Sequence, residues 1–417
     1  MAWQRIAASS LGINLRVKPA VFVPLIIWGA ILAMTPIAQA QTLTVLHNFT
    51  GGADGANPFA GVTLDQQGRI YGTATLGGIH SQGAVYRLVH QSGGWVFSPL
   101  YSFGSQQHDG NQPYARVLIG PNGLLYGTTY SGGAENYGTV FSLQPPATTC
   151  KSFICPWIET VLYSFTGGAD GGNPYNGDLA FDAVGNIYGT TAYGGSSGYG
   201  VVFKLARSSS GWTESVLWDF TCGNDGCNPY AGVIFDGAGN LYGTTQFGGS
   251  GGIGTVYELS PTQSGWSETT LSSLPGVSGT NSGGLAMDAQ GDLFGLTGDI
   301  QPGSVYELTP QNGGWSFAIL KTFTVYNFTG PLAAPSLDAR GDVYGPLPNG
   351  GDGEEGEIFK LTRAGEQWIY SSFYQFGDGD GGIYPIGAVT FDAGGNMYGT
   401  SNAGGVYGGG VVWEIMP

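Results

Sequence analysis

The chain has 417 residues, and 76 of them are glycine, yet it also holds 23 Tyr, 21 Phe and 10 Trp. A disordered glycine-rich chain would be poor in aromatic residues, so this composition excludes a flexible linker and indicates short strands joined by tight turns. The net charge of −16 disfavours nucleic acid and anionic membranes as partners and leaves cations, neutral glycans and basic proteins.

The first 40 residues have the pattern of a secretory signal peptide. Three basic residues precede an apolar run at 20–34, and Ala38-Gln39-Ala40 provides a small-x-small cleavage site. An uncleaved membrane anchor is the alternative, but the run is shorter than the ~20 residues that a spanning helix needs. We therefore expect a mature chain of residues 41–417 that is exported to the periplasm, the cell surface or the exterior, with no transmembrane segment. It keeps 10 Lys and Arg against 29 Asp and Glu, a net charge of −19.

Residues 42–49 after the leader read as a single strand outside any repeat. Seven units follow, each marked by a turn of the form Asp-x-x-Gly-Asn/Asp and then Tyr-Gly-Thr or a variant of it. The marker aromatics are spaced 50 to 62 residues apart: Tyr71, Tyr126, Tyr188, Tyr242, Phe294, Tyr344 and Tyr398. A repeat of this kind must be recognised before any domain count, so residues 41–417 are predicted to form one domain.

Each unit is predicted to contain four short antiparallel strands. The fourth unit shows them at residues 232–271, where β-branched and aromatic residues dominate and Gly, Asp or Asn occupies each turn. No 3.6-residue apolar period of useful length follows the leader, so helix content should be very low. A sheet with apolar residues on both faces needs cover on both sides, and a ring of blades supplies it. A linear β-solenoid is the main alternative, but its rungs are shorter, ~20–30 residues, and pair in parallel.

The two ends of the mature chain complement each other. The last unit stops after Gly410–Ile415 without its Trp-initiated strand, and residues 42–49 match the end of that strand in other units. The sequence therefore predicts an all-β, seven-bladed β-propeller of four-stranded antiparallel blades, closed by the N-terminal strand completing the last blade.

The four cysteines form two pairs with equal spacing. In an exported chain this predicts two local disulfides, Cys150–Cys155 and Cys222–Cys227. A shared zinc site is the alternative, but the propeller would place the pairs on opposite faces.

The repeated pattern resembles a known family. The run Asp-Phe-x-Gly-x-Asp-Gly-x-Asn-Pro-Tyr, followed by Asp-x-x-Gly-Asn-x-Tyr-Gly-Thr-Thr, Gly-Gly and Gly-x-Val-Phe-x-Leu, is similar to the GloVer-type (Gloeo/Verruco) tandem repeat of exported bacterial proteins. The resemblance covers residues 43–417, although the fifth and sixth units depart from it at 275–284 and 325–335. It implies export and a propeller-like fold, without an established chemistry.

The loops that would join blade to blade repeat the pattern Asp-Gly-x-Asn-Pro-Tyr/Phe. One interpretation is a rim of carboxylates and amides that binds Ca²⁺ or glycan hydroxyls. The simpler interpretation is turn chemistry, because Asp-Gly and Asn-Pro satisfy local backbone groups without a ligand. The candidate residues, with no metal assigned to them, are Asp54, Asn57, Asp109, Asp170, Asn173, Asp225, Asn228, Asp378 and Asp380.

Other chemistry-bearing residues are interpreted as structural. The Asp residues of the repeated Asp-x-x-Gly turns, such as Asp65 and Asp182, should accept from backbone amides, and the recurring Trp and Tyr should pack between blades. His80 and His108 fall in loops of the same face; a metal or acid–base pair is the alternative to the favoured interpretation, that they are surface residues. No catalytic residue is assigned.

Two functions follow as hypotheses. The first is an exported, non-enzymatic, monomeric propeller that presents an interaction surface to a protein, a glycan or an envelope component. The second is a Ca²⁺-dependent propeller hydrolase, lactonase or lyase with its site at the mouth of the central channel. Both occur on propellers, so the fold cannot decide between them.

Overall fold

The computed structural model describes residues 41–146, 157–209, 211–275, 283–298, 303–323, 333–377 and 381–417. The predicted signal peptide and the Cys150/Cys155 pair lie outside these ranges. The described part of residues 41–417 contains strands and no helix. It therefore includes no apolar helix of membrane-spanning length.

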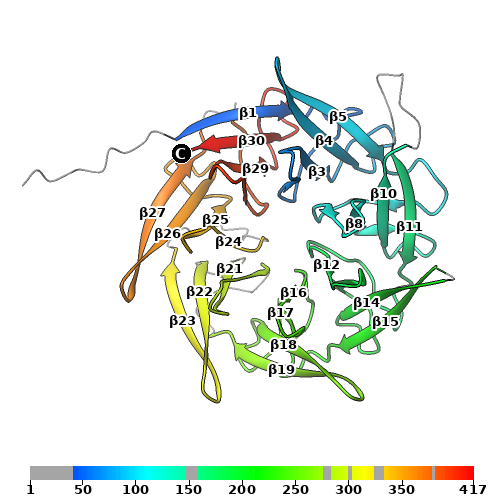
Figure 1. Ribbon diagram of the computed structural model, residues 1–417, viewed down its shortest axis with the longest axis vertical. Coiled ribbons are helices and arrows are strands. Elements are labelled where there is room, and N and C mark those ends of the chain that lie inside the picture. Colours follow the sequence, from blue (N-terminus) through cyan, green and yellow to red (C-terminus); the bar gives the residue numbers. More distant parts are fainter. Residues whose placement is uncertain are drawn as a thin grey trace, which may run out of the picture. The chain divides into compact units, whose positions relative to one another are not determined.

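Seven four-stranded antiparallel sheets stand around a common axis, which confirms the seven-bladed propeller (Figure 1). In chain order the first four blades consist of β2 (Thr63–Leu64), β3 (Ile70–Ala74), β4 (Ala84–Gln91) and β5 (Gly94–Ser102); β7 (Leu118–Ile119), β8 (Leu125–Thr129), β10 (Thr139–Gln144) and β11 (Ile158–Ser164); β12 (Ala180–Phe181), β13 (Ile187–Thr191), β14 (Val201–Ser208) and β15 (Gly211–Asp219); and β16 (Ile234–Phe235), β17 (Leu241–Thr245), β18 (Thr255–Thr262) and β19 (Gly265–Ser273). A small extra ladder joins β6 (Gly110–Asn111) to β9 (Ser131–Gly132).

The other three blades repeat the arrangement. They consist of β20 (Leu285–Met287), β21 (Leu293–Thr297), β22 (Ser304–Gln311) and β23 (Gly314–Thr322); β24 (Ser336–Leu337), β25 (Val343–Leu347), β26 (Glu357–Ala364) and β27 (Gln367–Gln375); and β28 (Thr390–Phe391), β29 (Met397–Ser401), β30 (Val411–Met416) and β1 (Thr42–Asn48).

The ring closes as the two chain ends predict. Strand β1 pairs antiparallel with β30, with Thr42 opposite Met416 and Asn48 opposite Val411, and the two strands lie side by side in Figure 1. The pairing satisfies two strand edges that would otherwise be free.

Each joint between blades has its own apolar core. Between the third and fourth blades, for example, Tyr188 and Val202 of one blade pack with Tyr257 and Leu259 of the next. The second strand of every blade is buried along its whole length, because neighbouring blades cover both of its faces. In the fourth blade a Cβ on Gly243 would lie 2.3 Å from the Tyr257 hydroxyl, so glycine in the Tyr-Gly-Thr motif leaves room for this ring.

The repeated Thr of the same motif connects consecutive blades. Thr73 Oγ1 donates to the carbonyl of Ala115 at 3.0 Å, and Thr190 Oγ1 donates to that of Ala231 at 2.8 Å. Thr400 repeats the bond to Ala60 across the closure of the ring at 2.8 Å.

Two kinds of loop share one face of the ring, which we call the upper face: those that join blade to blade and those that join second to third strands. The hairpin turns with the Asp-x-x-Gly pattern lie on the opposite, lower face. Each innermost strand therefore runs from an upper-face loop to a lower-face turn.

Candidate functional site

The predicted rim carboxylates are engaged within their own loops. Asp170 accepts from the backbone N–H of Thr166 at 2.9 Å and from the Tyr163 hydroxyl at 2.9 Å. Asp225 accepts from the N–H and the hydroxyl of Thr221 at 2.9 and 2.6 Å. Asp54 has the corresponding bonds with Thr50 and also accepts from His47.

Asp109 is the most heavily hydrogen-bonded of these residues. It is buried, and its carboxylate accepts from the Tyr101 hydroxyl and from the backbone N–H groups of Gly104, Ser105 and Gly110, all within 2.7–3.0 Å. This bonding orders the loop between the first and second blades.

The predicted rim amides connect each loop to the blade before it. Asn57, Asn173 and Asn228 have left-handed φ values of 52°, 55° and 56°, a conformation that Asn tolerates better than most residues. Their side-chain amides donate to the carbonyls of Asn402, Tyr130 and Ala192.

These candidate residues stay in separate loops. Among the described residues, no three His, Cys, Asp or Glu side chains come close enough together to hold a metal ion. Asp378 and Asp380 lie outside the described residues. Ca²⁺ binding at the rim therefore remains a prediction, whereas loop structure and contacts between blades account for the hydrogen bonds described above.

The lower-face Asp residues have the expected turn role. Asp182 Oδ1 accepts from the N–H groups of Val184 and Asn186, and its Oδ2 accepts from the Tyr188 hydroxyl at 3.1 Å. Burial raises the pKa of Asp182, but these bonds and that from the Asn186 side chain outweigh it, so the pKa is lowered overall. Asp65 and Asp236 share this arrangement and its lowered pKa.

A continuous group of aromatic rings lies beside the mouth of the central channel on the upper face. It follows the Asn/Gln-Pro dipeptides of four consecutive blades, so that rings more than 50 residues apart in sequence are in contact. We call it the aromatic arc, and its members are Phe59, Tyr114, Tyr130, Tyr175, Tyr193 and Tyr230.

The arc is held by ring contacts. The centroids of Phe59 and Tyr114 lie 5.0 Å apart, those of Tyr114 and Tyr175 4.8 Å, and those of Tyr175 and Tyr230 5.1 Å. Tyr130 packs edge-on against both Tyr114 and Tyr175. All these rings are half-buried, so their edges are packed while part of each remains accessible.

Three phenol groups of the arc are held neutral by their burial. Burial raises the pKa of Tyr114, Tyr130 and Tyr230. The hydroxyls of Tyr193 and Tyr230 lie 2.9 Å apart and hydrogen-bond to each other. The arc thus offers flat apolar surface together with neutral hydroxyl donors and acceptors.

Each blade contributes one residue, just before the start of its innermost strand, to a ring that surrounds the channel next to the arc. Five of the seven ring residues are Gly or Ala, and neighbouring backbones approach closely there: a Cβ on Gly232 would lie 2.1 Å from the carbonyl oxygen of Asp178. The ring residues are Gly61, Arg116, Asp178, Gly232, Gly284, Ala334 and Ala388.

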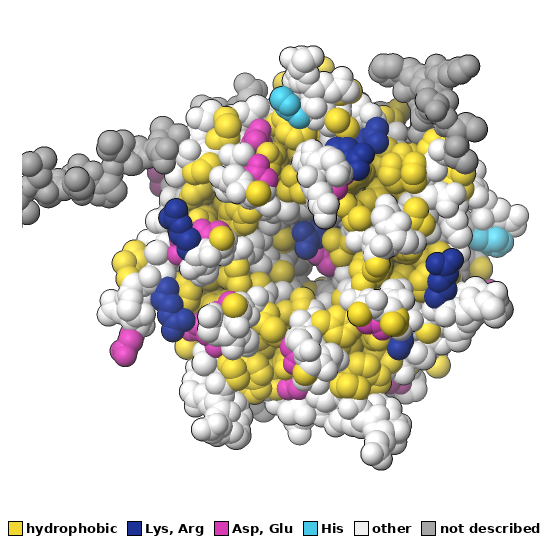
Figure 2. All heavy atoms as spheres, viewed as in Figure 1, with side chains coloured by type: hydrophobic (Ala, Val, Ile, Leu, Met, Phe, Trp, Pro, Cys, Tyr) yellow, Lys and Arg dark blue, Asp and Glu magenta, His cyan; other side chains and the backbone are white. Residues whose placement is uncertain are grey.

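The two charged ring residues belong to neighbouring blades and pair with each other. Arg116 Nε donates to Asp178 Oδ2 at 2.6 Å, and about a quarter and a third of their side chains are exposed, 26% and 36%. Figure 2 shows one basic and one acidic group beside the central opening, where the surrounding surface is mainly apolar. The channel here is a cavity of about 320 Å³ that continues past the ring between Leu118, Phe181 and Phe235.

The joint between the second and third blades departs from the repeat in several ways. One residue separates Tyr114 from Arg116, but two separate Tyr175 from Asp178, so the third unit has one extra residue. The Thr bond between blades is also missing at this joint, because the buried Thr128 hydroxyl has no hydrogen-bond partner. The joint between the second and third blades therefore combines these irregularities with the Tyr114–Tyr175 stack and the Arg116–Asp178 ion pair.

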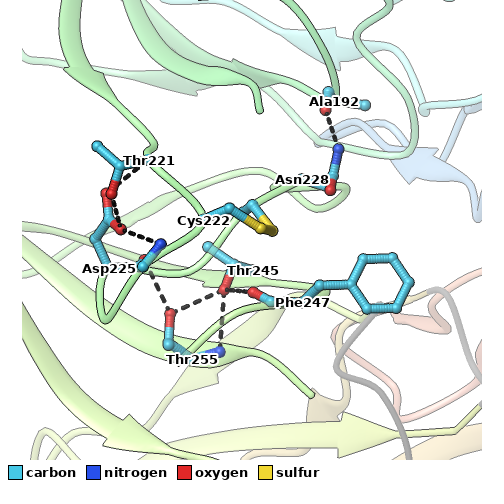
Figure 3. Close-up of a disulfide and its surroundings, with 10 residues drawn as sticks. Ala192, Thr221, Cys222, Asp225, Asn228, Thr245, Phe247 and Thr255 are labelled. Atoms are coloured by element: carbon cyan, nitrogen blue, oxygen red, sulfur yellow. Dashed lines mark hydrogen bonds between the residues drawn. A yellow bond between two sulfur atoms is a disulfide. The ribbon is translucent and has the colours of Figure 1, made fainter. Parts of the chain in front are cut away.

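A disulfide fixes the loop that carries Tyr230. Cys222 and Cys227 are bonded, as predicted, and Figure 3 shows the bridge between Asp225 with its Thr221 contacts and the Asn228–Ala192 hydrogen bond. The corresponding positions in the first unit are Gly51 and Ala56, whose loop closes with the same backbone bond. The bridge thus constrains a loop that forms elsewhere without it.

The histidines have separate surroundings. His47 Nε2 donates to the Asp54 carboxylate at 3.1 Å, and the His47 ring stacks on Phe97. Burial lowers the pKa of His47 against the opposing effect of the Asp54 carboxylate. His80 and His108 are both exposed.

Buried carboxyl groups also escaped the sequence analysis, and Glu159 is one of them. Glu159 on β11 is 7% exposed, its Oε1 has no hydrogen-bond partner, and it lines a cavity with Gln106 and His108. Burial, with a smaller contribution from the Asp109 carboxylate, raises its pKa to about 8. Glu214 takes the same strand position in the next blade, and burial raises its pKa to about 7.

The comparisons with known proteins agree with this architecture. Residues 27–155 and 154–302 match the model of the Gloeobacter/Verrucomicrobia repeat, which is more than half of the chain. The chain belongs to this family. The blades after residue 302 continue the pattern of the Gloeobacter/Verrucomicrobia repeat to the C-terminus. No protein of curated function is significantly similar in sequence.

Several solved structures share the fold of this Gloeobacter/Verrucomicrobia repeat protein. The extracellular domain of BT4673 from B. thetaiotaomicron is 12% identical over 90% of this chain with a TM-score of 0.55, and this chain spans only 40% of it. The polysaccharide lyase Uly1 is 12% identical with a TM-score of 0.50 over 89% of this chain and 91% of the lyase. At these identities the likeness concerns the fold alone.

Sequence reasoning missed the arc and the ion pair. Four of the six rings of the arc follow the repeated Asn/Gln-Pro dipeptide, which indicates a turn in each unit considered by itself. A signal was available in the ring position, because aligning the units places Arg116 and Asp178 where Gly61 and Gly232 stand.

Proposed function

We propose that the protein is an exported carbohydrate-binding module whose ligand lies across the aromatic arc. The observation that carries the proposal is the contact between Tyr114 and Tyr175, flanked by Phe59 and Tyr230, which joins four blades into one aromatic surface. Sugar rings have apolar C–H faces and polar edges, and an aromatic floor with neutral hydroxyl groups complements both.

The packing of the arc favours binding. Because the rings of Phe59, Tyr114, Tyr130, Tyr175 and Tyr230 are half-buried and packed against their neighbours, they lose little side-chain freedom when a ligand binds. Tyr130 also supports a binding role. Other blades have Thr75, Ala192 and Gln246 at the same repeat position, so the fold does not require an aromatic residue there. An aromatic residue that the repeat does not need is better explained by a ligand.

Export is part of the proposal and has two supports. The leader has the pattern of a signal peptide, and the Cys222–Cys227 disulfide suits an oxidising compartment. An extracellular domain and a polysaccharide lyase are among the proteins with the same fold. The alternative hypothesis of a Ca²⁺-dependent hydrolase, lactonase or lyase gains no specific observation among the described residues.

The experiment is a calorimetric titration of the mature protein with oligosaccharides of defined composition. We expect saturable binding to at least one series, and about a tenfold or greater loss of affinity in Tyr114→Ala and in Tyr175→Ala, the range for removing an aromatic anchor. Tyr407→Ala is the matched control, because Tyr407 is 63% exposed on the same face but is in no ring contact of the arc. Equal losses in all three variants, or binding that none of them affects, would contradict the proposal.

A further inference from the structure

Charged residues are distributed unevenly over the two faces of the propeller. In the described upper-face loops, Arg116 is the only Lys or Arg, and it is already paired with Asp178. The other described bases lie on strands or in lower-face turns. The acidic residues of the described upper-face loops are Asp54, Asp109, Glu135, Asp170, Asp178, Asp225, Asp352, Glu354 and Glu355.

The carboxylates also recur in register with the arc. Asp54, Asp109, Asp170 and Asp225 each stand five residues before one of its rings: Phe59, Tyr114, Tyr175 and Tyr230. Asp109 and Asp225 are buried at 7% and 8% exposure among N–H donors, with no basic side chain bonded to them. Charge held in such a place is weakly screened by solvent, so its field reaches the nearby surface.

The arc itself favours positive charge. The face of a tyrosine ring carries the negative part of its quadrupole and attracts a cation within about 6 Å. Neutral phenols preserve this property, and burial keeps the phenols of Tyr114 and Tyr130 neutral by raising their pKa. The aromatic faces and the surrounding carboxylates therefore both favour a positively charged ligand.

We infer that the glycan bound at the arc carries cationic amino groups, as in a polymer of unacetylated hexosamine. The inference rests on the proposed function and narrows its ligand class. An acidic glycan would meet the repulsion of the upper-face carboxylates, and a neutral glycan would gain nothing from them. A protonated amino sugar obtains both the aromatic contact and the electrostatic attraction.

The test compares glucosamine oligomers with N-acetylglucosamine oligomers of the same length at about pH 6, below the ordinary pKa of such an amine. We expect the glucosamine series to bind about tenfold more tightly at low salt and to lose most of that advantage at 0.5 M salt, where charges are screened over roughly 4 Å. Equal or tighter binding of the acetylated series would overturn the inference and leave the proposed function standing. Binding of neither series, nor of any other glycan, would end both.

A charge variant tests the electrostatic part separately. Asp178→Asn keeps the size of the side chain and removes its charge, leaving Arg116 as an unpaired cation beside the arc. We expect about a fivefold loss of affinity for the glucosamine series and little change for the acetylated series. Glu366→Gln, which removes an exposed charge from a lower-face hairpin, is the control and should change neither. An equal loss of both series in Asp178→Asn would contradict the inference.

Discussion

Tyr114 and Tyr175 stack across the joint between the second and third blades, with ring centroids 4.8 Å apart and an interplanar angle of 30°. Phe59, before β2 of the first blade, and Tyr130, after β8 of the second blade, pack edge-on against this pair. The stack thus connects the second and third blades at a joint where the Thr128 hydroxyl forms no hydrogen bond between them.

Removing only the hydroxyl of Tyr114 separates ring contact from hydrogen bonding. We expect Tyr114→Phe to keep its oligosaccharide affinity within about threefold, because the ring face is unchanged, whereas Tyr114→Ala loses about tenfold or more. Isothermal titration of the two variants in parallel measures the difference. A loss in Tyr114→Phe as large as that in Tyr114→Ala would mean that the phenol group, and not the ring face, holds the sugar.

The Thr residue between blades gives a matched pair of stability variants. Thr190→Val removes the bond to the buried carbonyl of Ala231 and should lower the free energy of unfolding by about 1–2 kcal/mol. Thr128→Val removes a buried hydroxyl that has no partner and should change it by less than about 0.5 kcal/mol or raise it. Urea unfolding of both variants checks this, and equal destabilisation would show that the second and third blades do share such a bond.

Most of the fold could be predicted because the signals for it are local and repeated. The alternation of apolar residues, the Asp-x-x-Gly turns and the orphan strand at 42–49 predict seven blades and their closure, and the β1–β30 pairing confirms it. The Cys222–Cys227 bridge follows from the equal spacing of two cysteine pairs in a chain that is expected to be exported.

The candidate site could be predicted much less well. Phe59, Tyr114 and Tyr175 are separated by 55 and 61 residues, and their contact depends on the curvature of the ring, which no single unit encodes. The same Asn-Pro-Tyr pattern serves a turn and a surface at once. The pairing of Arg116 with Asp178 needs both the ring geometry and the extra residue of the third unit.

The buried carboxyl of Glu159 predicts a dependence of stability on pH. Its pKa is about 8 in the folded chain against 4.5 ordinarily, so between these values the unfolded chain releases the proton that the folded chain retains. Stability therefore falls as pH rises from 4.5 to 8, and Glu159→Gln removes this loss. We expect the variant to be more stable by on the order of 2 kcal/mol at pH 8 and unchanged at pH 4.

Thermal melting across this pH range measures the effect of Glu159→Gln. Glu268→Gln is the control on the corresponding strand of the fourth blade, where the Glu268 carboxylate accepts a hydrogen bond from Thr270 and is raised in pKa mainly by burial. A smaller gain is expected there. A pH-independent change in the Glu159 variant would show that its carboxyl is not the group responsible.

The disulfide should contribute modestly to stability and not at all to the existence of the fold. Cys222→Gly with Cys227→Ala installs the residues that the first unit has at Gly51 and Ala56. We expect a loss of at most about 2 kcal/mol, from loop entropy in the unfolded chain. Melting of the wild-type protein with and without reductant should show the same difference, and failure of the variant to fold would contradict this role.

The most direct test of the account is a crystal structure of the mature protein with a glucosamine oligomer bound. We predict a sugar ring over the accessible faces of Tyr114 and Tyr175, with its amino group toward the acidic upper-face loops. An oligomer that binds in solution but occupies another surface, with the arc empty, would contradict the central claim.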